Sequence, residues 1–254
     1  FRPAVIRARA QARLLLAGAG AGLAMGLGWV AYVRALEALP VATVGVVYMT
    51  FPVFALIAAW ALFAERPTSR GLAASGMVAV AAALAAGPAA LHPGAAGMIA
   101  LAFLAPATFG AAIAFLVHLL PPLPVLARMG VISLGSVAGL LPLVLATPAA
   151  EILPGDARAL ALVVGVSLGT ALVPQLLYTV FAPVVGSARA ATAGAVELPT
   201  MLAIGWLALG EAITVPQAAG ALLIVGAVAL SPSRKVRGPD MTAATTPRRR
   251  PRRH

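Results

Sequence analysis

The chain has 254 residues, of which 61% are hydrophobic and 10% are charged, and its net charge is +11. Soluble globular domains contain about 45 to 50% apolar and about 25% charged residues, so this composition excludes a soluble protein. The apolar residues come in blocks of about 20, the length of a membrane-spanning helix, rather than in the alternating segments of about 10 that form barrels. The sequence therefore predicts an all-α, polytopic helical bundle in a lipid bilayer.

Eight hydrophobic stretches predict helices that cross the membrane, and prolines and charged residues separate them. They cover residues 14–33, 41–64, 70–88, 96–118, 125–147, 158–181, 187–209 and 214–231. The residues before position 14 are expected to be a loop. In the first span Gly18, Gly22 and Gly26 recur every fourth residue, which predicts a face that packs closely on another helix.

The distribution of basic residues predicts the topology. If the N-terminal segment is cytoplasmic, every lysine and arginine except Arg34 and Arg158 falls on the cytoplasmic side, as the positive-inside rule requires. We therefore expect both ends in the cytoplasm and a location in a bacterial inner or plasma membrane.

The last residues, 232–254, are polar, proline-broken and strongly basic, which predicts a disordered cytoplasmic tail. No aromatic platform accompanies these charges, so contact with anionic lipid is expected and nucleic-acid binding is not. The chain has no cysteine and only three dispersed histidines, so neither a metal site nor a cofactor is expected.

Two segments are weakly similar to each other. Residues 32–65 read YVRALEALPVATVGVVYMTFPVFALIAAWALFAE, and residues 178–211 read YTVFAPVVGSARAATAGAVELPTMLAIGWLALGE. Their first tyrosines and last glutamates lie 146 residues apart, and the central prolines, Pro52 and Pro199, lie 147 apart. An odd number of spans separates the copies, so they have opposite orientations, which is typical of secondary transporters.

These copies predict the domain organisation. The second repeat, residues 95–231, contains five predicted helices, whereas the first, residues 1–88, contains three. We therefore expect eight helices here from a ten-helix, five-plus-five inverted repeat that lacks its first two helices.

The same order of motifs occurs in both copies: an Ala-Leu segment before proline or alanine, a run rich in glycine and alanine, and then Pro52-Val-Phe-Ala or Glu197-Leu-Pro. A glutamate and a final glycine-bearing helix follow. This order resembles the EamA family of the drug/metabolite transporter superfamily. The resemblance implies a ten-helix transporter with its substrate cavity between the repeats. In the family's second repeat a glutamate directly precedes the proline, whereas Leu198 intervenes here.

Glu197 is the main candidate for a functional residue. Counted from Arg189, it lies about 12 Å into its span, near the middle of a bilayer of about 30 Å. An acidic residue there costs about 2.5 to 3.5 kcal/mol on insertion scales and tends to hold its proton. Two roles fit: a group that carries a proton during transport, and a protonated side chain that hydrogen-bonds a neighbouring helix.

Helix breaks and polar side chains at a similar depth complete the predicted site. Prolines inside spans free backbone carbonyls, and matched breaks mark substrate sites in transporters, although simple packing kinks fit equally well. The predicted substrate-binding and coupling residues are Tyr48, Thr50, Pro52, Gln175, Tyr178, Glu197 and Pro199. Weaker candidates beside them are Pro106, Thr108, Thr170 and Pro174.

Other polar residues are predicted to be structural. Glu65 and Glu211 lie at span ends as interfacial anchors or caps, with Glu65 near Arg66 and Arg70. His118 is expected to reach the interface, and the spacing of Arg34 and Glu37 predicts an ion pair on one helix.

The predicted function is a secondary transporter that moves a small metabolite, an amino acid or an amine by alternating access, with protons as a candidate coupling ion. No enzymatic activity is expected. A non-transporting membrane scaffold is the main alternative, and a membrane-embedded transferase is the weaker one, because the acidic pair Glu151 and Asp156 has no further ligand nearby. A homodimer is compatible with the sequence.

Overall fold

The computed structural model describes residues 2–39, 41–86, 96–148, 152, 154–210 and 212–231. Within these ranges the chain forms helices and no strand, which confirms the predicted all-α membrane bundle. Several predictions fall outside the described residues: those for Glu151, Glu211, His92 and the tail from residue 232.

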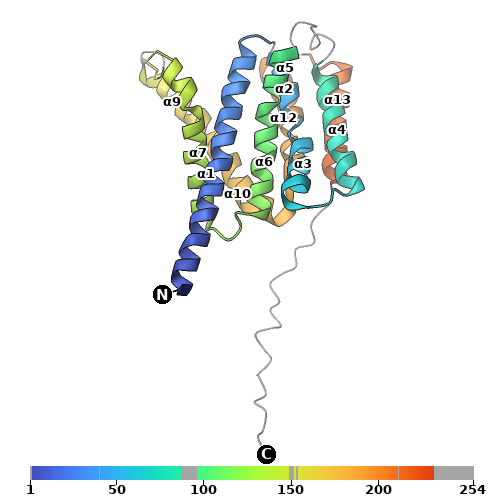
Figure 1. The fold of residues 1–254 in the computed structure, drawn as a ribbon. Coiled ribbons are helices and arrows are strands. Elements are labelled where there is room, and N and C mark those ends of the chain that lie inside the picture. Colours follow the sequence, from blue (N-terminus) through green and yellow to red (C-terminus); the bar gives the residue numbers. More distant parts are fainter. Residues whose placement is uncertain are drawn as a thin grey trace, which may run out of the picture.

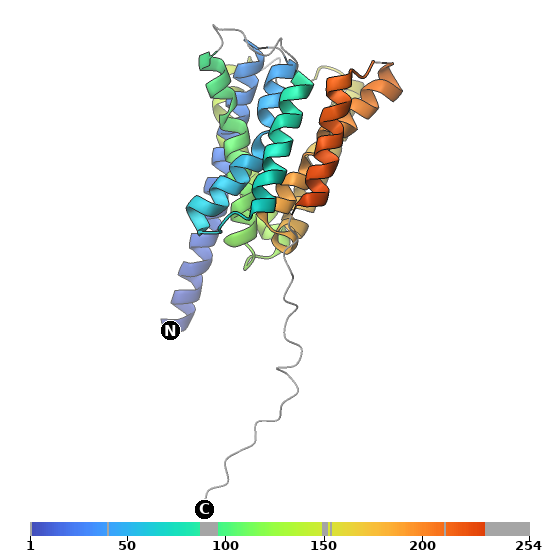
Figure 2. The same cartoon turned by 90° about the vertical axis from the view of Figure 1, so that its right-hand side faces the viewer.

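The helices follow the predicted spans closely, and most of them run along a common direction (Figures 1 and 2). Their bounds are α1 Arg2–Leu36, α2 Val41–Tyr48, α3 Phe51–Phe63, α4 Ser69–Ala86, α5 Ala96–Ala102, α6 Leu104–His118, α7 Val125–Ala146, α9 Ala157–Ser167, a π-helix Leu168–Leu172, α10 Val173–Val185, α11 Ser187–Gly194, α12 Glu197–Leu209 and α13 Val215–Leu230. By length and composition, four described helical segments can cross a membrane unaided: Arg9–Leu36, Ala96–His118, Val125–Ala146 and Ala157–Val185.

The predicted loop before residue 14 is wrong, because α1 is helical from Arg2. Alanine and arginine are strong helix formers and alternate through this segment, and Pro3 lies in the first turn, where proline is tolerated. The change from charged to apolar composition suggested that the helix begins at the apolar span. The helix propensity of the preceding residues instead extends the same helix through the charged segment.

Glycines bring α1 and α7 into close contact, and the two helices lie side by side (Figure 1). A Cβ added to Gly26 would lie 2.8 Å from the Cα of Gly139, and a Cβ on Gly22 would collide with the carbonyl oxygen of Ile132. Since the colliding atoms belong to backbone, no side chain can move aside. The small-residue face predicted on the first span is therefore the surface that packs on α7.

We expect Gly26→Ala to lower the thermal stability of the detergent-purified protein clearly, by an overpacking cost of about 1 to 3 kcal/mol. Gly20→Ala, on the same helix, is the matched control, because a Cβ there meets nothing within 4 Å. Equal melting temperatures for the two variants would contradict the close packing of α1 on α7.

Two of the predicted spans are each divided into a short and a longer helix. Helices α2 and α11 have 8 residues, and the helices that follow them, α3 and α12, have 13. In each case two residues separate the halves, and the corresponding ends lie 146 positions apart, as in the sequence comparison. The two similar segments thus fold into the same broken-helix unit.

The packing of these units is uneven. Helix α4 packs on α13, and α3 packs on α6 and α11. In contrast, no residue of α9 or of the π-helix is buried, although both are strongly apolar. Exposure of such apolar helices is consistent with contact with the lipid bilayer.

Candidate functional site

All four prolines predicted to interrupt spans lie at helix breaks. Pro52 is the second residue of α3, Pro174 is the second residue of α10 and follows the π-helix, and Pro106 and Pro199 are the third residues of α6 and α12. A proline in a first helical turn costs no hydrogen bond within its own helix, so each one marks where a new helix starts. The extra residue before Pro199 accounts for its later position in α12.

Six aromatic side chains from five helices form one continuous group, here called the aromatic cluster. Its members are Trp29 and Tyr32 of α1, Tyr48 of α2, Phe51 of α3, Phe109 of α6 and Tyr178 of α10. Neighbouring ring centroids lie between 5.1 Å (Phe51 and Phe109) and 5.9 Å (Tyr32 and Tyr48) apart. These spacings are typical of favourable aromatic pairs, so the cluster fixes the end of α2 and the middle of α10 relative to α6.

The break between α11 and α12 lies against this cluster. A Cβ added to Gly194, the last residue of α11, would collide with the hydroxyl of Tyr178 and would lie 3.1 Å from Cζ of Phe51. Glycine at this position therefore makes room for the Tyr178 hydroxyl. In the first unit the corresponding position, the last residue of α2, is Tyr48.

Glu197 is the first residue of α12, and its side chain is exposed. A carboxylate in the first turn of a helix is favoured by the helix dipole, which stabilises its charge. Within the described part of the chain, neither the Glu197 carboxylate nor any of the three tyrosine hydroxyls has a hydrogen-bond partner. Two of these unbonded groups, the Tyr178 hydroxyl and the Glu197 carboxylate, lie at the break between α11 and α12.

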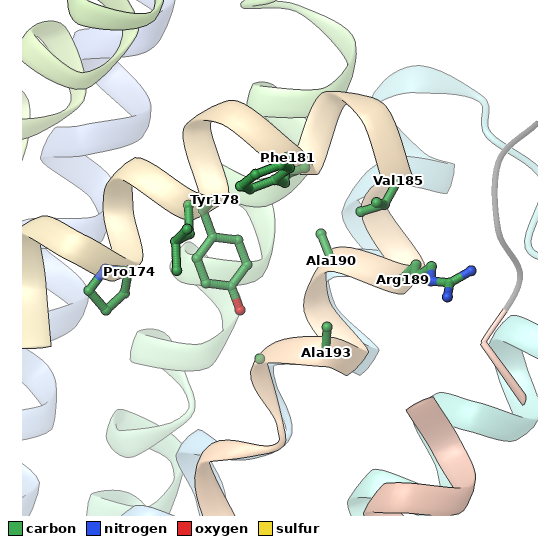
Figure 3. Close-up of a pocket in the computed structure, with 10 residues that line it drawn as sticks. Pro174, Tyr178, Phe181, Val185, Arg189, Ala190 and Ala193 are labelled. Atoms are coloured by element: carbon green, nitrogen blue, oxygen red, sulfur yellow. The ribbon is translucent and has the colours of Figure 1, made fainter. Parts of the chain in front are cut away.

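Two cavities meet at Tyr178 and Pro174. The larger, of about 360 Å³, lies between α10 and α11 and extends along Phe181 and Val185 to Arg189 (Figure 3). The smaller, of about 160 Å³, lies between α1, α6, α7 and α10 and includes Trp29 and Gln175 in its lining. Both linings are mainly apolar, as is usual for small-molecule sites.

The structure brings some of the predicted site residues together and gives others a local role. Tyr48 and Tyr178 both contact Phe109, and the helix break before Glu197 lies against Tyr178. Gln175 lines the smaller cavity and donates a hydrogen bond to Oγ of Ser133 at 3.0 Å. The remaining hydroxyls bond their own helices: Thr50 to the carbonyl of Val47, Thr108 to those of Leu104 and Ala105, and Thr170 to that of Val166.

Comparison with known proteins bears on the first of the two units. The model of the EamA-like transporter family matches residues 4–87, which include α1 to α4. This segment of the chain is thus similar to the EamA-like transporter family.

The other comparisons are less specific. A solved structure titled "Crystal structure of protein" is similar to this chain with a TM-score of 0.65 and 16% identity, over 85% of this chain and 86% of that one. At this identity the likeness concerns the fold alone. No curated protein matches the chain.

Sequence reasoning missed four of the six members of the aromatic cluster: Trp29, Tyr32, Phe51 and Phe109. Single aromatic residues are common in membrane helices, so nothing local distinguished these from residues that face lipid. The one available signal was the pairing of Phe51 with Glu197, which occupy the same position in the two similar segments.

A second polar contact joins the ends of α3, α6 and α11. Nε2 of His118 lies 2.6 Å from Oε2 of Glu65, and Oγ of Ser187 donates to the same carboxylate oxygen at 3.2 Å. Ala64 adopts a left-handed φ of 54°, which ends α3 directly before Glu65. Glu65 was expected near Arg66 and Arg70, but its partner here is His118, a residue predicted only to reach the interface.

This contact does not resemble a hydrolase triad. Nε2 of His118 faces both the serine, at 3.2 Å, and the carboxylate, whereas a triad uses opposite ring nitrogens for the two partners. The arrangement suits a structural tie between helix ends, reinforced by the ring of Phe63 stacked on His118 at 5.0 Å.

We expect Glu65→Gln and His118→Gln each to lower the melting temperature of the purified protein by a similar amount, and the double variant to lower it little further. When two residues stabilise one another, the losses of stability from replacing each of them do not add. Thermal unfolding of the wild type, the two single variants and the double variant measures this coupling. Glu37→Gln, which breaks the predicted and observed pair with Arg34 (3.0 Å) on an exposed helix face, is the control with little effect. Fully additive losses would show that Glu65 and His118 act independently.

Proposed function

We propose that this EamA-like protein is a secondary transporter that moves a small molecule by alternating access, with its substrate near Tyr178 and with Glu197 as the group that couples transport to protons. The observation that carries the proposal is the break between α11 and α12, where Gly194 lies against the Tyr178 hydroxyl and Glu197 begins the next helix. In transporters, discontinuous helices with unbonded polar groups are where substrates and ions bind.

The paired broken helices support a mechanism in which one unit moves relative to the other. We take residues 1–88 and 95–231 as two inverted repeats, which the equal lengths of α2 and α11, and of α3 and α12, support. The packing of α4 on α13, which are also 146 positions apart at their starts, would then lie at the axis between the repeats. Motion about this axis would expose the site alternately to each side.

The matched positions differ in one respect that favours coupling in the second repeat only. Phe51 begins α3, whereas Glu197 begins α12. A protonatable group is therefore present at one of the two breaks. We place the protein in a plasma membrane with both ends of the chain in the cytoplasm. The coupling ion would then be the proton, driven by the proton gradient across that membrane.

The test is flux in proteoliposomes that contain the purified full chain, measured for a panel of amino acids, amines and neutral metabolites. Accumulation of at least one compound that requires an imposed proton gradient would support the proposal. A non-transporting scaffold, the alternative function, would show no flux above that of empty vesicles for any compound, under any gradient.

A further inference from the structure

The larger of the two cavities is a groove along one face of α10. Its α10 residues recur every three or four positions, which places them in one stripe on the helix: Pro174, Leu177, Tyr178, Phe181 and Val185. The facing wall, on α11, includes the small residues Ala190, Ala193 and Gly194. The groove, with a volume of about 360 Å³, is therefore the space that small side chains on α11 leave beside large ones on α10.

This groove opens on the outer surface of the bundle. Leu177 and Phe181 are 50% and 54% exposed, and they belong to the apolar segment Ala157–Val185, which is long enough to cross a membrane. From Pro174 to Val185 the stripe is about 16 Å long at helical rise. One leaflet contributes about half of a hydrocarbon core of about 30 Å, which is nearly the same length. An acyl chain of a lipid in the adjacent leaflet can therefore lie along the groove.

Positive charge gathers at the end of the groove where α11 begins. Arg189 lines the groove there (Figure 3). The start of α4 packs on the same turn of α11, since a Cβ on Gly71 would lie 3.8 Å from the Cβ of Ala188. Arg66 lines a small cavity that also includes Ala188, and Arg70 directly precedes Gly71. Three arginines thus lie at one corner of the bundle.

These arginines have no negative partner in the part of the chain that the structure describes, because none of them forms an ion pair there. The carboxylate of Glu65 lines the small cavity beside Arg66, but it is already bound by His118 and Ser187. Basic pockets between membrane helices attract anionic lipid headgroups. A guanidinium suits phosphate in particular, since it can donate two parallel hydrogen bonds to it.

We infer that this groove binds one anionic phospholipid, with its phosphate at Arg189 and one acyl chain along α10 toward Tyr178. A soluble anion would leave the apolar groove empty, and an uncharged lipid would leave the arginines without a partner. The chain would end beside Tyr178, which lines both cavities, so the lipid would support one wall of the proposed substrate site. The inference does not depend on the proposed transport function.

Native mass spectrometry of the full chain in detergent tests the charge of the headgroup. The probes are phosphatidylglycerol and phosphatidylcholine with the same acyl chains, and we expect the first phosphatidylglycerol to bind more tightly. Arg189→Gln should weaken its binding by about 5-fold, the effect of one basic residue near a membrane surface. Arg158→Gln, at the opposite end of the segment Ala157–Val185, removes the same charge and should bind like the wild type.

A second variant tests the position of the acyl chain. Ala193→Leu fills the groove without changing any charge, and Ala193 is itself exposed, so the larger side chain has room. We expect weaker binding of both lipids with an unchanged melting temperature. Inorganic phosphate, the headgroup charge without a chain, should not displace phosphatidylglycerol at an equal concentration.

Four results would each overturn the inference. They are equal binding of the two lipids by the wild type, equal losses in Arg189→Gln and Arg158→Gln, full binding by Ala193→Leu, and displacement of the lipid by an equal concentration of phosphate. The last of these would show a site for a soluble anion, and full binding by Ala193→Leu would show attraction of headgroups by surface charge alone.

Discussion

Uptake driven by an imposed proton gradient should fall to the level of empty vesicles when Glu197 is replaced by glutamine. Glutamine has nearly the same shape and still accepts hydrogen bonds, but it cannot take up or release a proton. The change therefore removes coupling without opening a hole at the start of α12. The measurement is initial uptake in proteoliposomes, for whichever compound the wild-type chain accumulates.

Two comparisons make this result specific. Glu37→Gln removes another carboxylate from the bundle, one that lies on an exposed helix face and pairs with Arg34, and should transport at the wild-type rate. Gradient-driven uptake that is unchanged in Glu197→Gln would remove the coupling role from this residue. Glu197 would then be a side chain that stabilises the first turn of α12.

Gly194→Ala is expected to reduce transport by about 5- to 30-fold, the range that corresponds to one or two kcal/mol. Its new methyl group would collide with the Tyr178 hydroxyl and crowd Phe51, so it would push Tyr178 away from Glu197. Overpacking of this size is typical for one added carbon at a filled position. Initial uptake rates and melting temperatures of the same preparations measure the effect.

Gly45→Ala is the matched control for this substitution. Gly45 lies in α2, the counterpart of α11 in the first unit, and a Cβ there meets nothing within 4 Å. The control should transport normally, since alanine also favours helix over glycine. Equal rates for the Gly45 and Gly194 variants would mean that the position of Tyr178 does not matter for transport.

The break at Glu197 also shows why the two similar segments are not equivalent. The first unit places Tyr48 and Phe51 on either side of its break, and both rings belong to the aromatic cluster. The second places Gly194 and Glu197 at the same positions. The first unit thus supplies the wall of the proposed site, and the second supplies its space and its charge.

The sequence by itself determined the all-α membrane fold, most helix ends and the positions of the breaks. These properties are local: an apolar block of about 20 residues forms a helix in lipid, and a proline is tolerated in the first turn of a helix, where Pro52, Pro106, Pro174 and Pro199 lie. The prediction of a loop before residue 14 was wrong, because the helix propensity of the alanines and arginines in this segment outweighs their polarity.

Only the tertiary structure decided which side chains meet. Glu65 and His118 are 53 residues apart, and Tyr48 and Phe109 lie on different helices, so no spacing along the chain indicates their contact. The sequence identified Tyr48, Tyr178 and Glu197 as separate polar residues at similar depth. The meeting of Tyr48 and Tyr178 at Phe109 depends on the packing of α2, α6 and α10, and the position of Tyr178 at the break before Glu197 depends on the space that Gly194 leaves. These are properties of the packed bundle.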